Sequence, residues 1–292
     1  MTTREASSLG KQIRLNRLFN ATSGRSFIVP MDHSVAMGPL GPAGHTDSVV
    51  GDLGGSGVNA VVLHKGRVRT VAPRRFTELA LIVHLSASTD FGPDTTAKVL
   101  VGEVAEALRI GADAVSVHIN IGSLTESRQL ADLAHVAAEC DGFGMPLLAM
   151  MYARGAAFEP GGAFAGQDAS IAALSHLAAV ATDLGADLVK LPWAGSVAAM
   201  REVVANSPLP VYVAGGEPKG SLADVATFTS TVLDSGVAGL TFGRTVFAAA
   251  SPRAVARSIA RLVHQPPTHL VAVSAEGRAL SNIESGRPQW TA

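Results

Sequence analysis

The fold is decided by a stretch that reads Gly185-Ala186-Asp187-Leu188-Val189-Lys190. It follows a helix-like segment, and glycine is favoured just past a helix end, where a positive φ is needed. A short apolar strand comes next and ends on a lysine. The same form (glycine, a small or polar turn, a strand) begins again at Gly57, Gly111 and Gly236. This internal repeat indicates a chain of similar strand–helix units.

Eight short apolar segments run along the chain without strict alternation, which is typical of parallel strands covered on both faces. They are residues 27–31, 60–64, 79–85, 114–120, 147–151, 188–190, 211–214 and 239–242. Helix-like segments lie between most of them, at residues 97–110, 127–139, 171–184, 197–205 and 222–234. The repeats mark the second, fourth, sixth and eighth strands, so the pattern predicts an α/β fold of the (β/α)₈ barrel type.

A doubly wound open sheet is the alternative architecture. It would usually carry a glycine-rich phosphate turn after its first strand. Here that strand ends on Pro30-Met31-Asp32-His33, which favours the barrel.

Three regions are expected. Residues 1–25 form an N-terminal cap, in which residues 12–19 alternate basic and apolar side chains and suit a short amphipathic helix at the bottom of the barrel. Residues 26–264 form the barrel. A C-terminal extension, 265–292, begins where Gln265-Pro266-Pro267 ends the last helix.

Composition narrows the class of protein. The chain has 292 residues, of which 47% are hydrophobic and 16% charged, so it can build a core and is not a disordered chain. Its net charge of −1 gives no reason to expect nucleic acid or a membrane as partner. The single cysteine, Cys140, fits a reducing compartment. With no apolar leader and no apolar segment of about 20 residues, a cytoplasmic location is expected.

Polar side chains follow the predicted strands, where barrel enzymes gather their chemistry. The strand ends supply Asp32, His33, His64, Lys65, Ser86, His118, Tyr152, Arg154 and Lys190. Such a ring on an otherwise apolar chain is hard to explain by packing alone.

Lys190 is the candidate nucleophile. The chain has only five lysines, and one at the end of a buried strand lies in poorly hydrated surroundings. Desolvation disfavours the ammonium and lowers its pKa, which frees the amine to attack a carbonyl. The structural alternative is that Lys190 reaches the surface or pairs with a carboxylate. Lys65 is the rival nucleophile, although the basic residues that follow it suggest anion recognition instead.

A phosphate site is expected after the last two strands. Gly215 and Gly216 follow the seventh strand, and Gly243 and Arg244 follow the eighth. Barrels commonly bind phosphate in these loops through backbone N–H groups. Glycine lets the backbone approach the oxygens, and arginine adds a bidentate cation.

The histidines near strand ends raise the question of a metal. The chain has no His-x-His pair and no Glu-x-x-His on a helix, so no catalytic metal is expected. His84 is expected to point into packing.

Five segments closely resemble the archaeal-type class I (Schiff-base) aldolases. They read IVPMDH at 28–33, VLHKG at 62–66, GADAVSVH at 111–118, MPLLAMMY at 145–152 and AGG at 214–216. The resemblance runs from about residue 9 to residue 264. Within the family it is strongest to enzymes that act on aspartate semialdehyde.

The resemblance implies a (β/α)₈ barrel that works through a lysine Schiff base without metal or cofactor. By motif, Lys190 is the Schiff-base lysine, Tyr152 the general acid/base, and Asp32 a carboxylate that moves protons and orients substrate. It implies a lyase or a transaldolase-type transferase in aromatic amino acid or aminohydroxybenzoate-type biosynthesis, in a homo-oligomer such as a decamer. The chain departs from many relatives at Leu191-Pro192-Trp193 and at Ser34.

The expected substrates are a phosphorylated ketone and an aldehyde. The ketone is dihydroxyacetone phosphate or a deoxy-ketohexose phosphate, and the aldehyde is L-aspartate 4-semialdehyde, whose carboxylate Arg154 would bind. Two alternatives stay open, namely a fructose-bisphosphate aldolase and a non-catalytic barrel subunit.

Overall fold

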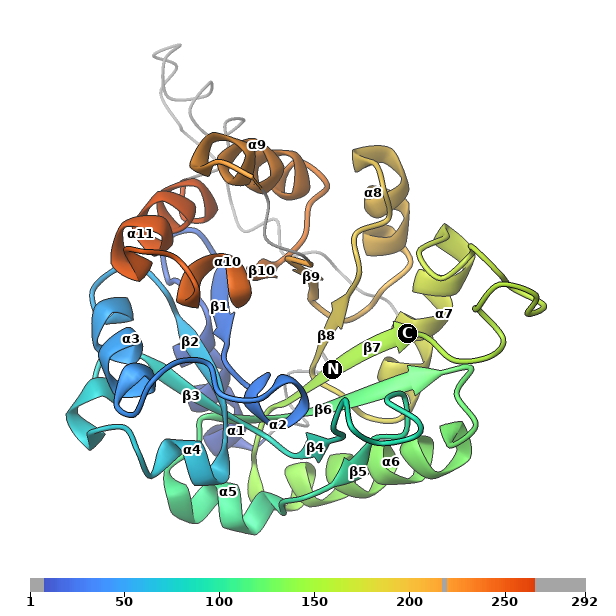
Figure 1. The fold of residues 1–292 in the computed structure, drawn as a ribbon, viewed down its shortest axis with the longest axis horizontal. Helices are drawn as coiled ribbons and strands as arrows, with labels where there is room; N and C mark the ends of the chain where they lie inside the picture. Colours follow the sequence, from blue (N-terminus) through green and yellow to red (C-terminus); the bar gives the residue numbers. More distant parts are fainter. Residues whose placement is uncertain (1–7, 217–219, 266–292) are drawn as a thin grey trace, which may run out of the picture.

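Eight parallel strands close into a barrel in the order β1-β10-β9-β8-β7-β6-β3-β2 (Figure 1). The structure, a computed structural model, describes residues 8–216 and 220–265. The strands are β1 (Ser26–Pro30), β2 (Ala60–His64), β3 (Ala80–His84), β6 (Ala114–Ile121), β7 (Leu147–Ala153), β8 (Leu188–Leu191), β9 (Val211–Ala214) and β10 (Gly239–Thr241). The predicted (β/α)₈ barrel is confirmed, and every strand end lies within two residues of its predicted position.

Helices surround the barrel and follow the strands in turn (Figure 1). They are α3 (His45–Leu53), α4 (Lys65–Val68), η1 (Pro73–Phe76), α5 (Val104–Ile110), α6 (Glu126–Phe143), α7 (Ile171–Asp183), α8 (Val197–Ala205), α9 (Leu222–Leu233), α10 (Arg244–Phe247) and α11 (Pro252–Val263). None of the helices in the described part of the chain is long and apolar enough to cross a bilayer. The C-terminal extension expected at 265–292 lies, apart from residue 265, outside the described residues.

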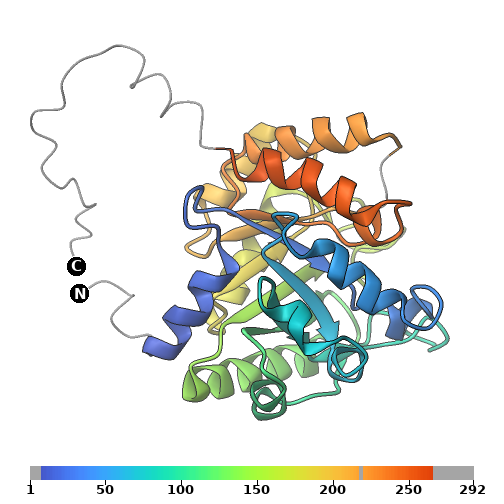
Figure 2. The same cartoon turned by 90° about the vertical axis from the view of Figure 1, so that its left-hand side faces the viewer.

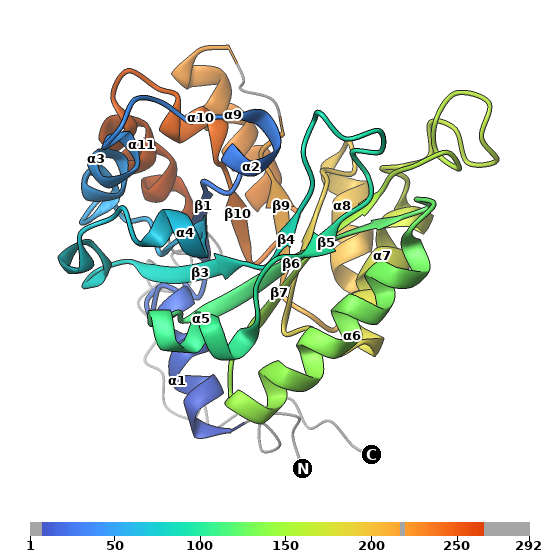
Figure 3. The same cartoon turned by 60° about the horizontal axis from the view of Figure 1, so that its bottom comes forward.

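The helix predicted at 97–110 is wrong over its first half. Only α5, from Val104 to Ile110, is helical, whereas β5 (Val99–Leu100) pairs antiparallel with β4 (Ser86–Ala87). The backbone N–H of Val101 donates to the carbonyl of Leu85, so this segment continues over the end of β3 instead of starting the helix. The small β4–β5 ribbon therefore lies at the rim of the barrel, on the same side as α2 (Ser34–Met37) (Figure 3).

The interior of the barrel is filled by alternate residues of each strand. A buried apolar cluster takes Ile28, Ala60, Val62, Ala80, Ile82, Ala114, Leu148, Met150, Leu188 and Tyr212 from seven of the eight strands. These positions are two residues apart wherever a strand contributes twice, because successive side chains of a strand point to opposite faces. The other face of each strand packs against the helices.

Helix α1 (Leu9–Leu18) lies at the end of the barrel opposite α2 and β4 (Figures 2 and 3). Leu18 is fully buried in the interior cluster, and Leu15 and Phe19 pack against it. The ring of Phe19 lies 6.2 Å from that of Tyr212, centroid to centroid. The amphipathic segment thus covers the bottom of the interior with its apolar face.

The polar residue of the repeat joins neighbouring strands at this end. In three repeats its side-chain oxygen accepts a hydrogen bond from a backbone N–H of the preceding strand in the barrel. The pairs are Asn59 with Phe27 at 2.8 Å, Asp113 with Leu81 at 2.9 Å and Asp187 with Leu147 at 2.9 Å. A buried N–H without a partner is costly, so this residue type follows from the geometry of the turn.

The two aspartates among these residues, Asp113 and Asp187, also bind α1. Lys11 Nζ lies 3.2 Å from Asp187 Oδ1, and Arg17 Nη1 lies 2.9 Å from Asp113 Oδ1. Burial raises the pKa of both carboxyl groups. The repeat therefore joins strand to strand and also fixes the helix that closes the bottom.

We expect Asp187→Ala to lower the free energy of unfolding by about 1–3 kcal/mol, because it leaves the Leu147 N–H without its partner and takes from the Lys11 ammonium the nearer of its two carboxylates. Urea denaturation measures the change. Asp141→Ala is the matched control, since Asp141 is the second partner of Lys11, at 3.8 Å, but its side chain is 80% exposed. It should cost less than about 0.5 kcal/mol. Equal losses in the two variants would contradict this account.

Candidate active site

A cavity of about 570 Å³ opens at the carboxyl ends of the strands. Its wall includes ten of the eleven residues expected from the sequence to form the site. They are Asp32, His33, Ser86, Tyr152, Arg154, Lys190, Gly215, Gly216, Gly243 and Arg244. Residues from all parts of the barrel sequence thus converge on one space.

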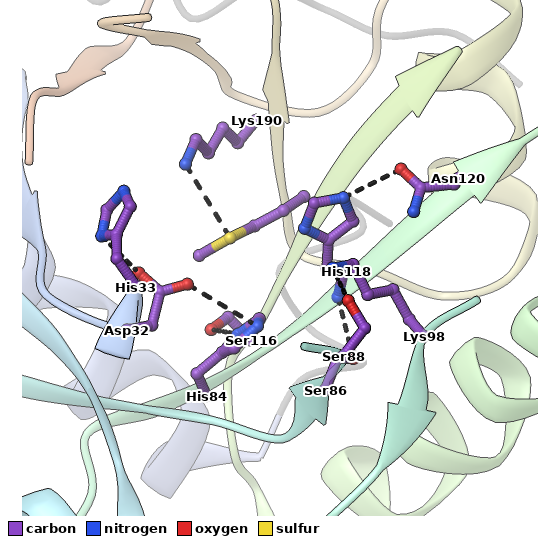
Figure 4. A network of polar contacts seen from close by, with 11 residues as sticks. Asp32, His33, His84, Ser86, Ser88, Lys98, Ser116, His118, Asn120 and Lys190 are labelled. Carbon is purple, nitrogen blue, oxygen red and sulfur yellow. Dashed lines mark hydrogen bonds and ion pairs between the residues drawn. The ribbon is translucent and has the colours of Figure 1, made fainter. Parts of the chain in front are cut away.

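Lys190 points into the barrel because it is two residues beyond Leu188 on the same face of β8. The residue is only 8% exposed, and its Nζ lies 3.9 Å from the Sδ of Met150 on the neighbouring strand β7. The amine is visible above this thioether, on the side of Asp32 and His33, in Figure 4. The structural alternative, in which the Lys190 side chain reaches the surface, is therefore wrong.

The same alternation explains which polar residues line the cavity. His64, His84 and Tyr152 each lie two residues beyond an apolar interior position of their strand. Asp32 lies on the same face as Ile28 of β1, four residues further along the chain. In these four series the apolar residues come first and a polar residue comes last.

Asp32 lies between two imidazoles. Its Oδ2 is 3.7 Å from His84 Nε2, and its Oδ1 is 3.7 Å from His33 Nδ1 (Figure 4). The Nδ1 of His84 is in turn 2.8 Å from the hydroxyl of Ser116. When Ser116 donates this bond, His84 Nε2 carries the proton and faces the carboxylate.

Burial and the charge interactions within the group together set its protonation states. Burial raises the pKa of the Asp32 carboxyl. Its charge interactions with His84 and His33, and next with Lys190, have the opposite and larger effect, so the pKa lies below its usual range. Burial lowers the pKa of His33 and of His64, and lowers that of His84 to about 4. At neutral pH, Asp32 is a carboxylate among neutral imidazoles and can accept a proton.

The ring of Tyr152 is held by two neighbours. The His118 ring stacks on it at 4.7 Å between centroids, and the Arg154 guanidinium carbon lies 4.2 Å from its centroid. His118 Nε2 is 2.9 Å from Asn120 Oδ1, and burial lowers the pKa of His118 well below its ordinary value. A neutral imidazole with a defined tautomer therefore supports the phenol ring.

The glycines after β9 and β10 occupy positions where a side chain does not fit. A Cβ on Gly215 would come within 2.6 Å of the Phe242 ring, and one on Gly243 would overlap the Pro30 carbonyl oxygen. Gly216 has a φ of +69°, and its carbonyl accepts a hydrogen bond of 3.1 Å from Arg244 Nη2. The two loops are thus joined at the rim of the cavity.

Lys65 is the expected site residue that the structure puts elsewhere. His64 faces the interior, so Lys65, one residue later, points outward and begins α4. Its Nζ lies 2.7 Å from Glu106 Oε2 of α5. It does not line the cavity that holds Lys190.

His84 and Lys98 are cavity residues that the sequence analysis misjudged or missed. The expectation that His84 points into packing is wrong, since it lines the cavity and faces Asp32. Lys98 also lines the cavity but had been assigned to a helix. The alternation of side chains along β3 would have identified His84, which lies two residues beyond the interior residue Ile82. No local sequence pattern indicates that Lys98 lines the cavity. Among the described residues, no group of three or more His, Cys, Asp or Glu side chains is arranged to hold a metal ion.

A buried lysine at the end of a strand in a closed (β/α)₈ barrel, with a carboxylate and a phenol in the same cavity, defines a barrel enzyme that can act on carbonyl compounds. The chain belongs to the DeoC/LacD family of aldolases, whose sequence profile it matches over residues 26–249. The family expected from the sequence motifs is thereby confirmed, and the chain is an enzyme of the aldolase class.

Two curated relatives match almost the whole chain. The chain is 46% identical to 2-amino-4,5-dihydroxy-6-oxo-7-(phosphonooxy)heptanoate synthase of Streptomyces griseus, over 92% of this chain and 96% of the relative. It is 37% identical to 2-amino-3,7-dideoxy-D-threo-hept-6-ulosonate synthase of Halobacterium salinarum, over 92% and 97%.

A solved structure supports the same family. An archaeal fructose-1,6-bisphosphate aldolase, with its catalytic lysine covalently bound to a carbinolamine intermediate, superposes with a TM-score of 0.75 at 25% identity. The match covers 87% of this chain and all of that chain.

The low pKa of His84 predicts a pH-dependent stability. The unfolded histidine binds a proton below about pH 6.5, and the folded one only below about pH 4. Between these values the unfolded state holds more protons, so the free energy of unfolding falls as the pH falls. One such group accounts for up to about 3 kcal/mol across the window.

Urea denaturation at pH values from 4 to 7 measures this dependence. His84→Gln should flatten the slope relative to the unsubstituted protein, while His135→Gln, which changes an exposed imidazole of α6, should leave it unchanged. The same slope in all three proteins would contradict the assignment.

Proposed function

We propose that the chain is a class I aldolase that joins a phosphorylated ketone to L-aspartate 4-semialdehyde through a Schiff base on Lys190. The observation that carries this proposal is the burial of the Lys190 amine at the end of β8, facing a cavity that Asp32 and Tyr152 also line. An amine kept from bulk water beside proton-transfer groups suits attack on a carbonyl.

The names of the relatives support the choice of substrates. The Streptomyces griseus relative is named for a seven-carbon product with a phosphate at one end and an amino acid at the other. Cleaving such a product between carbons 4 and 5 gives a three-carbon phosphorylated ketone and a four-carbon amino acid aldehyde, namely dihydroxyacetone phosphate and aspartate semialdehyde. The Halobacterium salinarum relative is named for a seven-carbon product with the same amino acid end. The other end of that product is an unphosphorylated deoxy ketone, which a deoxy-ketohexose phosphate could supply on cleavage, so this sugar phosphate is the second candidate donor.

The steps balance as follows. The Lys190 amine adds to the ketone carbon, and loss of water leaves an iminium ion. A base removes a proton from the adjacent carbon and gives an enamine. The enamine carbon bonds to the aldehyde carbon, and the aldehyde oxygen takes a proton. Water then hydrolyses the iminium, which releases the product and the free lysine.

Asp32 and Tyr152 move these protons in the proposal. Asp32 is ionised at neutral pH because its pKa is lowered. The amine of Lys190 points toward the side of the cavity where Asp32 lies (Figure 4). Tyr152 supplies and recovers the proton at the oxygen of the aldehyde. General acid–base groups of this kind typically contribute 10²–10⁴-fold in rate.

The phosphate of the donor would bind at the loops after β9 and β10. Gly215, Gly216 and Gly243 line the cavity there without side chains, which would let an anion approach their backbone, and Arg244 joins the two loops. A phosphate bound at these loops, away from the reacting carbon, would orient the donor without taking part in the reaction. Arg154, on the other side of Tyr152, would bind the acceptor.

Fructose-bisphosphate cleavage is the alternative reaction. It is favoured by the structural match, which is to an archaeal fructose-1,6-bisphosphate aldolase at 25% identity. The 46% identity to the synthase favours condensation. The other alternative, a non-catalytic barrel subunit, is set aside because the chain is an enzyme of the aldolase class. A homo-oligomer and a cytoplasmic location also stay predictions.

Borohydride trapping tests the Schiff base. We expect incubation with dihydroxyacetone phosphate and borohydride to add the mass of one donor, less one water lost on iminium formation and plus two hydrogens from reduction, and peptide mapping to find it on Lys190. Lys190→Met should abolish the adduct, because the nucleophile is gone while the stem remains. An adduct on Lys65 would overturn the assignment.

A comparison of two reactions identifies the substrate. We expect condensation of dihydroxyacetone phosphate with L-aspartate 4-semialdehyde to exceed cleavage of fructose 1,6-bisphosphate by at least about tenfold in kcat/KM, which corresponds to roughly 1.4 kcal/mol of transition-state stabilisation. A deoxy-ketohexose phosphate should be assayed as the second donor. Faster cleavage of the bisphosphate would select the alternative reaction.

A further inference from the structure

Lys98 occupies an unusual place for a lysine. It precedes β5 and lines the cavity, and its side chain is half buried. Its Nζ donates a hydrogen bond to the hydroxyl of Ser88, which itself donates to the carbonyl of Thr95 at 3.0 Å. The hydroxyl is thus fixed from both sides, and it holds the ammonium at one point of the cavity wall (Figure 4).

Neither Lys98 nor Arg154 belongs to an ion pair among the residues that the structure describes. Burial lowers the pKa of Lys98, and the charge of Arg154 lowers it further, while Asp32, Asp90 and Asp94 act in the opposite direction. Lys98 is half buried, whereas Arg154 is exposed where it lines the cavity. The three carboxylates offset part of the repulsion between the two cations, and an anion bound between the cations would offset more of it.

The two cations lie on the opposite side of Lys190 from the glycine loops. In the order of the barrel, β10 and β9 lead to those loops, β8 carries Lys190, and β7 carries Tyr152 and leads to Arg154. The next strand, β6, is joined to β4 by the bond from the His118 N–H to Ser86 Oγ, 3.0 Å long. The β4–β5 ribbon therefore brings Lys98 to the side of β6 and β7. A substrate with an anion at each end could span the two sites, with its reacting carbon at Lys190.

The chemistry of the second site suits a carboxylate. The loops after β9 and β10 offer backbone groups at several glycines, which fits the many oxygens of a phosphate. At Lys98 and Arg154 the donors are one ammonium and one guanidinium, which match the two oxygens of a carboxylate. We propose that Lys98, positioned by Ser88, binds the carboxylate of the acceptor aldehyde together with Arg154 and selects aldehydes that carry one.

This inference rests on the proposed function, and three acceptor aldehydes test it. L-Aspartate 4-semialdehyde and succinic semialdehyde carry the carboxylate, whereas propanal lacks it. Lys98→Met removes the charge but keeps the stem. We expect kcat/KM for both semialdehydes to fall about 10- to 100-fold, the usual size for loss of a charged hydrogen bond, while propanal changes less than about threefold. Ser88→Ala should cause a smaller loss with the same selectivity.

Arg128→Gln is the matched control, because it removes one positive charge from an exposed position of α6, away from the cavity. It should leave all three reactions unchanged. Equal losses for propanal and the semialdehydes in Lys98→Met, or no loss at all, would overturn the inference. So would a greater loss for glyceraldehyde 3-phosphate than for the semialdehydes, which would assign the site to phosphate.

Two further measurements separate this inference from the proposed function. Borohydride trapping of the donor on Lys190 should be as complete in Lys98→Met as in the unsubstituted protein. L-Homoserine, which carries an alcohol in place of the aldehyde, should bind the unsubstituted protein at least about tenfold more tightly than Lys98→Met in calorimetry. If the donor is never trapped, the proposed function fails, yet homoserine binding still decides the role of Lys98. Equal homoserine binding by both proteins would overturn that role.

Discussion

Side-chain alternation in a closed barrel is the constraint on which the rest of this structure depends. Each strand has one face toward the interior and one toward the helices, and the interior is too narrow for anything but packed side chains. Apolar residues therefore fill most of it from the bottom, and five strands lead to a polar residue at the open end, namely Asp32, His64, His84, Tyr152 and Lys190. Lys190 lies at such a position two residues above Leu188. Its amine is held among the side chains of neighbouring strands and is removed from solvent without being sealed off.

The electrostatics of the cavity follow from the same burial. Burial keeps four imidazoles near the reacting centre neutral, since it lowers the pKa of His33, His64, His84 and His118. Asp32 remains ionised among them. Fixed cations are spread around the rim, with Arg244 beside the glycine loops and Arg154 on the far side of Tyr152. In the proposed function, proton-transfer groups in the interior are thus separate from anion-binding groups at the rim, which suits a substrate whose charged ends are remote from its reactive carbon.

Most of the fold and much of the site could be predicted from the sequence. The Gly185–Lys190 stretch and its repeats mark strand starts, so the barrel and its strand ends follow from local pattern. A search for polar residues at strand ends that ignores side-chain alternation, however, treats His64 and Lys65 alike. The His64 side chain points into the barrel, whereas that of Lys65 points outward. Lys98 was missed for a different reason. The β4–β5 ribbon is held by pairing with residues 12 to 14 positions away, which no local propensity reports, and a helix over 97–110 would have carried this lysine away from the cavity.

The repeat stretch itself serves both ends of the barrel within six residues. Its aspartate, Asp187, binds the backbone of β7 and the Lys11 ammonium at the closed end, and three positions later Lys190 presents its amine at the open end. A single residue inserted or deleted between them would turn the lysine toward the helices and at the same time displace the anchor of α1. Length variation is accordingly expected in the loops that follow the strands, while the spacing from Asp187 to Lys190 is the part of the chain least free to drift during evolution.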